Sequence, residues 1–107
     1  MNNDPTLPQL QQYMADLCRE RGWDKASDLE TFLLFSEEVG EMAKAIRRRR
    51  KLFQEQGKPG SQEHQNELAH EMADILSYLL DLANRFDVDL QQAFLEKEEI
   101  NAQRQWE

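Results

Sequence analysis

Two pairs of acidic residues could do chemistry together: Glu38 with Glu41, and Glu71 with Asp74. Each pair lies in a segment of helical periodicity, and because a helix turns about 100° per residue, positions three apart share one face. If the two helices pack antiparallel, all four carboxylates converge. Clustered carboxylates repel one another and are costly to bury, whereas hard cations such as Mg²⁺ and Mn²⁺ prefer carboxylate oxygens. The spacing therefore predicts a divalent-metal site.

A solvated acidic face is the alternative interpretation of each pair. Charged residues make up 32% of the chain, so a single Glu-x-x-Glu pair arises readily on an exposed helix. The stripe of the first pair continues in apolar residues, Leu34 before it and Ala45 after it. The stripe of the second pair continues in Tyr78 and Leu82. Two acidic pairs with apolar flanks arise less often by chance than one pair, so the metal site and the solvated face both stay open on spacing alone.

A third group of polar residues lies near the end of the sequence. Lys97, Asn101 and Arg104 stand at i, i+4 and i+7, on the same side as Leu90 and Phe94. An ammonium, an amide and a guanidinium suit phosphate oxygens. Opposite a metal held by four acids, they would match a nucleoside di- or triphosphate. The alternative is a frayed helix end at which all three are solvated.

The elements that must position these groups are all helical. Apolar residues recur at helical spacing in four segments, and no stretch alternates in the manner of a strand. The expected helices run from Pro8 to Gly22, from a capping box at Ser27 to about Phe53, from Ser61 or Gln62 to a break at 85–88, and onward from a cap at Asp89. The sequence predicts an all-α fold, an antiparallel four-helix bundle in a single domain of residues 1–107. A domain this small buries a limited share of its surface, so we expect oligomerisation to complete the bundle.

Composition excludes several classes of partner. With 13 basic and 21 acidic residues the net charge is −8, which disfavours binding to nucleic acid. No apolar run approaches the roughly 20 residues that a membrane span needs, and no signal-peptide pattern is present. The one cysteine, Cys18, permits no intrachain disulfide. These features predict a cytoplasmic protein without a membrane partner.

Two longer stretches carry a family resemblance. EEVGEMAKAI, from Glu37, and HEMADILSYLLDLANRFDVDLQQAFLEKEEINAQR, from His70, resemble the MazG-like nucleotide pyrophosphohydrolases. That family has Glu-Glu-x-x-Glu, a variable gap, Glu-x-x-Asp, and later Lys-x-x-x-Asn-x-x-Arg. The resemblance covers roughly residues 9 to 104. It implies an enzyme that hydrolyses nucleoside triphosphates, by our expectation deoxynucleotides, to monophosphate and pyrophosphate in nucleotide-pool housecleaning.

The resemblance also implies roles for single residues. Glu38, Glu41, Glu71 and Asp74 would hold Mg²⁺, with Mn²⁺ as a substitute, and Glu38 or Glu41 would act as the catalytic base. Glu37 would be auxiliary, because one branch of the family lacks an acid there.

On the substrate side, the resemblance implies that Lys97, Asn101 and Arg104 bind the phosphates. Trp23 would stack on the base, although a hydrophobic plug is an equal alternative for this side chain. Arg48 stands where one branch of the family has a tryptophan that helps to hold the base, so base preference is not carried over. A homodimer or homotetramer is expected.

Two other functions compete with the enzyme. A helical binding or regulatory module could keep the fold without turnover, but a decayed site usually loses a ligand and here all four acids are present. A di-iron protein is suggested by Glu67 and His70, one Glu-x-x-His motif. The second copy that a di-iron site needs is absent from the sequence, which disfavours that function.

Overall fold

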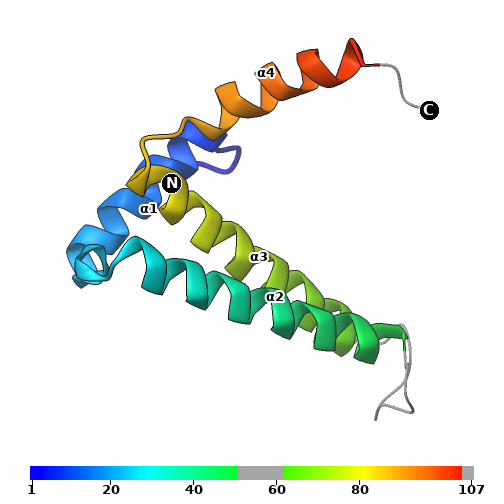
Figure 1. The fold of residues 1–107 in the computed structure, drawn as a ribbon. Coiled ribbons are helices and arrows are strands. Elements are labelled where there is room, and N and C mark those ends of the chain that lie inside the picture. Colours follow the sequence, from blue (N-terminus) through cyan, green and yellow to red (C-terminus); the bar gives the residue numbers. More distant parts are fainter. Residues whose placement is uncertain (51–61, 105–107) are drawn as a thin grey trace. The chain divides into compact units, whose positions relative to one another are not determined.

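The computed structural model describes residues 1–50 and 62–104, whose main elements are helical (Figure 1). They form α1 (Leu7–Arg21), a short 3-10 helix η1 (Trp23–Lys25), α2 (Asp28–Arg50), α3 (Gln62–Arg85) and α4 (Leu90–Ala102). No strand occurs in the described ranges, so the all-α prediction is confirmed. The expected end of the second helix near Phe53 and the break at 56–61 lie outside the described residues. No described helix combines the length and apolar character needed to cross a membrane.

The chain divides into two compact units. The first joins Met1–Lys25 to the residues from Leu80 onward, and the second comprises Ala26–Leu79. The first unit thus holds α1, η1, the end of α3 and α4. The second holds α2 and most of α3. We call these two helices the helix pair. The assignment of residues 1–107 to one domain stays a prediction.

Local capping chemistry sets the ends of α1. The Gln9 backbone N–H donates to Thr6 Oγ1 over 3.3 Å, and the Thr6 N–H donates to Gln9 Oε1 over 2.8 Å. This reciprocal pair satisfies two backbone donors at the helix start. The helix therefore begins at Leu7, one residue before the expected start at Pro8. Gly22 ends it with φ of 74°, a left-handed conformation that glycine adopts without steric cost.

The connection from α3 to α4 is a tight turn built without glycine. Asp87 has a φ of 55°. The Val88 N–H donates to Ala83 O over 2.8 Å and the Asp87 N–H to Asn84 O over 3.3 Å, the bond pattern of a Schellman motif. Aspartate tolerates this left-handed position better than most residues. Asp89 then caps α4, as predicted, accepting a bond from the third backbone N–H of the helix over 3.0 Å.

The helix pair is antiparallel. Ser27 caps α2, accepting a 3.0 Å bond from the backbone N–H three residues on, as its capping box predicts. Near the other end of α2, Arg48 pairs with Glu67, and Arg49 Nε donates to Gln65 Oε1 over 3.0 Å. Late residues of α2 therefore meet early residues of α3, and the two helices run side by side in opposite directions (Figure 1). This register is what brings the middle of α2 against the acidic residues of α3.

The two units differ in how much apolar surface they bury. In the first, Met14, Cys18 and Leu80 form a buried cluster, against which pack Leu7, Leu10, Leu17 and Leu90. In the second unit, Ala45 alone is buried among the described hydrophobic residues. Many larger side chains of the helix pair are exposed: Leu29, Phe32, Leu33, Leu34, Val39, Ile46, Met72, Leu76 and Leu79. An apolar surface of this extent is typical of an interaction face.

Candidate metal centre

The helix pair gathers three carboxylates. Glu38 of α2 and Glu71 and Asp74 of α3 each offer an oxygen, and these oxygens lie within 4.8 Å of one another. We call these residues the acidic trio. Ligand oxygens on opposite sides of one Mg²⁺ ion are about 4.2 Å apart, twice the usual Mg–O distance. Small side-chain rotations would therefore suffice for the trio to share one cation.

Crowding changes the acidity of Glu38. A side-chain hydrogen bond with Glu71, loss of solvation, and the nearby charges of Glu71, Asp74 and Glu41 raise the pKa of Glu38 to about 7. The hydrogen bond is the largest cause, because the protonated form of Glu38 is the one that can donate to the Glu71 carboxylate. Removing that proton leaves like charges in contact, unless a cation compensates.

Glu71 provides an independent sign that the trio suits a cation. Its Oε2 atom is buried and has no hydrogen-bond partner among the described residues. A buried carboxylate oxygen without a donor is unfavourable, because it has lost its hydrogen bonds to water and has no hydrogen bond within the protein to replace them. A divalent cation would compensate this oxygen, so the residues present fit the metal that their spacing predicts.

Glu41 and Glu37 lie outside the trio. Glu41 is exposed and pairs with Lys44 Nζ at 3.5 Å, one turn further along α2. Its charge nevertheless contributes to the raised pKa of Glu38, so it lies within electrostatic reach of the trio. Glu37 is exposed on α2. The structure thus brings together three of the four predicted ligands, and the role of Glu41 stays a prediction.

The predicted phosphate-binding residues belong to the first unit. Lys97 is exposed on α4, and Arg104 is exposed just beyond the end of α4. Asn101, in the last turn, is half-buried, and its Oδ1 atom is buried without a hydrogen-bond partner among the described residues. Lys97 and Asn101 thus lie on α4, and Arg104 follows two residues after the end of that helix.

Trp23, the predicted base-stacking residue, is fixed through a hydrogen bond to its backbone carbonyl, while its ring stays accessible to solvent. Its carbonyl accepts a bond from Arg85 Nη2 over 3.0 Å, and the Arg21 guanidinium lies 5.1 Å from the ring centre. The residue is 49% exposed. Sequence reasoning overlooked Arg85 as the anchor of this turn. The available signal was Asp81, four residues earlier in α3, which pairs with Arg85 Nε at 3.1 Å while both side chains remain 15% exposed.

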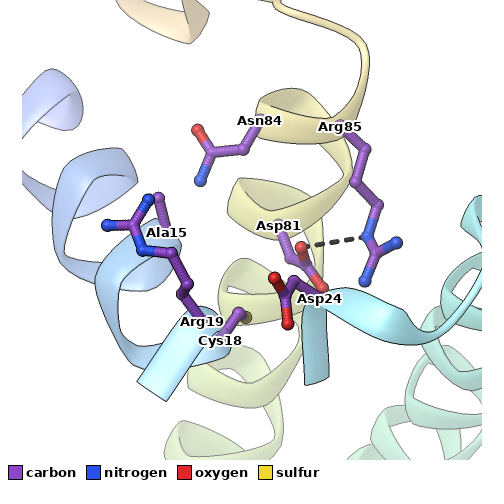
Figure 2. Close-up of a pocket in the computed structure, with 7 residues that line it drawn as sticks. All are labelled: Ala15, Cys18, Arg19, Asp24, Asp81, Asn84 and Arg85. Carbon is purple, nitrogen blue, oxygen red and sulfur yellow. Dashed lines mark hydrogen bonds and ion pairs between the residues drawn. The ribbon is translucent and has the colours of Figure 1, made fainter. Parts of the chain in front are cut away.

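This ion pair lines a pocket of about 200 Å³ in the first unit (Figure 2). Its lining consists of Ala15, Cys18, Arg19, Asp24, Asp81, Asn84 and Arg85. Burial, followed by the charge of Asp81, raises the pKa of the Cys18 thiol. A thiol held in its protonated form is a poor nucleophile and a poor metal ligand. Cys18 therefore acts as a core residue, as its place on the apolar stripe of α1 indicates.

Comparison with known proteins identifies the family. Residues 27–103 match the model of the MazG nucleotide pyrophosphohydrolase domain, a range that includes the acidic trio and ends one residue before Arg104. Proteins described as dCTP pyrophosphatase 1 are similar over 106 residues, with 34% identity in Homo sapiens and 33% in Rattus norvegicus. The alignments cover 94% of this chain and 59% of those proteins, so the chain spans less than two thirds of the length of these curated relatives. The resemblance seen in the sequence is confirmed, and the chain belongs to the MazG nucleotide pyrophosphohydrolase domain family.

Proposed function

We propose that this protein hydrolyses nucleoside triphosphates to the monophosphate and pyrophosphate with the help of a divalent cation, Mg²⁺ or in its place Mn²⁺. The observation that supports this most is the acidic trio with the orphaned Oε2 of Glu71, inside a MazG domain. The similarity to proteins named dCTP pyrophosphatase 1 supports a deoxynucleotide as substrate. A housecleaning role in the cytoplasm is consistent with such a substrate.

The cation would be held by Glu38, Glu71 and Asp74, and Glu41 would join them on leaving Lys44. When bound, it supplies charge neutralisation for the phosphate oxygens and lowers the pKa of a coordinated water. Glu38 or Glu41 would accept the proton of the attacking water. That water forms a bond to the α-phosphorus, and the bond from this phosphorus to the bridging oxygen breaks, its electrons leaving with pyrophosphate. Either side chain would accept it in the carboxylate form.

Substrate contacts would come from the polar residues of the first unit. Lys97, Asn101 and Arg104 would bind phosphate oxygens and offset the charge that develops on pyrophosphate. Trp23, whose ring is accessible, would stack on the base. Arg48 is engaged by Glu67 within the helix pair, which supports leaving it out of the base contacts.

The product of the reaction tests this proposal. Incubated with a panel of deoxynucleoside triphosphates and Mg²⁺, the protein is expected to release pyrophosphate and the monophosphate in equal amounts, and a chelator should abolish the release. Orthophosphate as the product would contradict the cleavage at the α-phosphorus. Mg²⁺-dependent binding of nucleotides without any product would instead favour the catalytically silent module.

We also propose that a second copy of the chain covers the exposed face of the helix pair, forming a homodimer or a homotetramer. The exposed apolar surface of the helix pair supports this proposal. Among its described residues Ala45 is buried, whereas Leu29, Leu33 and other large apolar side chains are exposed. Sedimentation velocity at micromolar concentration should show a dimer or tetramer, and Leu33→Glu should shift it toward monomer. Gln12→Glu, which adds the same charge at an exposed polar position of α1, outside the helix pair, should leave the assembly intact. A monomeric wild-type protein would contradict the proposal.

A further inference from the structure

Gln11 of α1 is a polar residue on a buried helix face, and it reaches across to the connection between α3 and α4. It is 8% exposed. Its Nε2 donates to Val88 O over 2.8 Å and to Asn84 Oδ1 over 3.1 Å, and its Oε1 accepts from the Leu90 N–H over 2.9 Å. Asn84 Nδ2 in turn donates to the Gln11 backbone carbonyl over 2.8 Å. Both donors and one acceptor of the Gln11 amide are thus engaged.

One of the groups that Gln11 contacts is a backbone donor that a helix start leaves without a partner. Leu90 is the first residue of α4, and its N–H has no acceptor within the helix. Asp89 satisfies the N–H of Gln92, so the cap and Gln11 serve different donors of the same helix turn. A buried backbone group that loses its only partner destabilises the fold. The start of α4 therefore depends on a side chain from α1.

Apart from the packing of α4 against α1, few contacts among the described residues fix the direction of α4. None of its 13 residues is buried, although Leu90 packs on the core cluster of the first unit. A helix of this length is marginal in water without tertiary support. From Leu90 to Asn101 the helix extends about 17 Å, so a tilt of about 10° at its first turn displaces Asn101 by about 3 Å. A displacement of that size breaks any hydrogen bond that Asn101 makes to a ligand.

We propose that Gln11 is a positioning residue for nucleotide binding: its amide, locked by Asn84, sets the first turn of α4 and through it the direction of Lys97, Asn101 and Arg104. This inference rests on the proposed function, in which those three side chains bind phosphate. Gln11 touches no substrate, and its effect passes through the backbone of Val88 and Leu90. It lies outside the residues matched by the family model.

The test compares Gln11→Met with Gln12→Met. Methionine keeps the length of glutamine and removes both hydrogen-bonding groups. Gln12 is the exposed neighbour, and its amide donates to Asp16 within α1 over 3.0 Å. Amide hydrogen exchange at Leu90 should accelerate in Gln11→Met alone. Affinity for a non-hydrolysable α,β-imido deoxynucleotide in the presence of Mg²⁺ should fall about tenfold in that variant, while Mn²⁺ binding measured without nucleotide stays at the wild-type level.

A kinetic comparison separates positioning from general damage. Gln11→Met should raise KM by a larger factor than it lowers kcat. Asn84→Ala, which keeps the Gln11 amide but removes the side chain that orients it, should show a smaller rise in KM. Asn84→Ala provides the test if Gln11→Met does not fold. Wild-type nucleotide affinity in these folded variants would overturn the proposal, as would an equal loss of Mn²⁺ affinity. Analogue binding without pyrophosphate release by the wild type would contradict the proposed reaction and not the role of Gln11.

Discussion

Asp74→Asn is expected to lower pyrophosphate release by about a thousandfold, since charge stabilisation at a transferring phosphoryl group is worth this much in comparable sites. Asparagine has the size of aspartate, so the substitution removes a negative ligand without creating a cavity. Asp74 is exposed, and the helix content should not change. Mn²⁺ affinity, measured by titration without nucleotide, should fall at least 10- to 100-fold.

Glu63→Gln is the matched control for this variant. Glu63 is an exposed acid in the first turn of the same helix, about two turns before Glu71 and outside the acidic trio. The substitution removes the same unit of charge and should leave turnover and Mn²⁺ affinity at the wild-type level. If Asp74→Asn behaves like this control, the assignment of the metal site to α2 and α3 is wrong.

Metal affinity should also depend steeply on pH. Because the pKa of Glu38 is raised to about 7, a proton and a cation compete for the same carboxyl below neutrality. The apparent affinity for Mg²⁺ should fall about tenfold for each pH unit below 7, and binding at pH 6 should release about one proton. Calorimetric titrations at pH 6 in buffers of different ionisation enthalpy measure that release directly.

The same carboxyl affects stability in the opposite sense to an ordinary ion-paired glutamate. Its pKa in the folded state lies above the reference value of 4.5, so the folded chain binds more protons between pH 4.5 and 7 than the unfolded chain does. The contribution of Glu38 to stability is therefore fully present below pH 4.5 and is lost as pH rises through 7. The metal-free protein should show a Tm that declines between pH 6 and 8, and Mg²⁺ should raise the Tm more at pH 8.

Glu38→Gln is the control for both measurements, because glutamine can share the hydrogen bond with Glu71 but has no proton to lose. The decline in Tm should be shallower in this variant, and the proton release at pH 6 should largely disappear. An unchanged pH dependence of Mg²⁺ affinity in Glu38→Gln would show that another group titrates in this range.

The sequence predicts this fold well where local chemistry decides it. Ser27 and Asp89 begin helices and Gly22 ends one, because each satisfies backbone groups within a few residues of itself. The acidic trio also agrees with the spacing, since Glu71 and Asp74 share one face of α3 and lie beside Glu38 of α2. The break after α3 was located correctly, although the left-handed conformation of Asp87 could not be read from its residue type.

Rotamer choices and contacts between distant segments do not follow from spacing. Glu41 was expected beside Glu38, but Lys44 lies one turn away and competes for its carboxylate. Whether Glu41 faces the trio or Lys44 depends on its side-chain rotamer, which residue spacing does not determine. Gln11 stands in helical register with Met14 and Cys18, so a polar residue on a buried stripe was visible. Its partners lie more than 70 residues away along the chain, and no local pattern identifies them.

The dependence of α4 on α1 has a practical consequence for where this protein can be cut. The range matched by the family model begins at residue 27, yet the glutamine that supports the start of α4 and the side chains of Met14 and Cys18 all precede it. A fragment trimmed to that range would keep every predicted acidic ligand while losing the support for α4. Deletion boundaries for this protein should therefore follow the buried contacts of α1, not the edge of the family-model match.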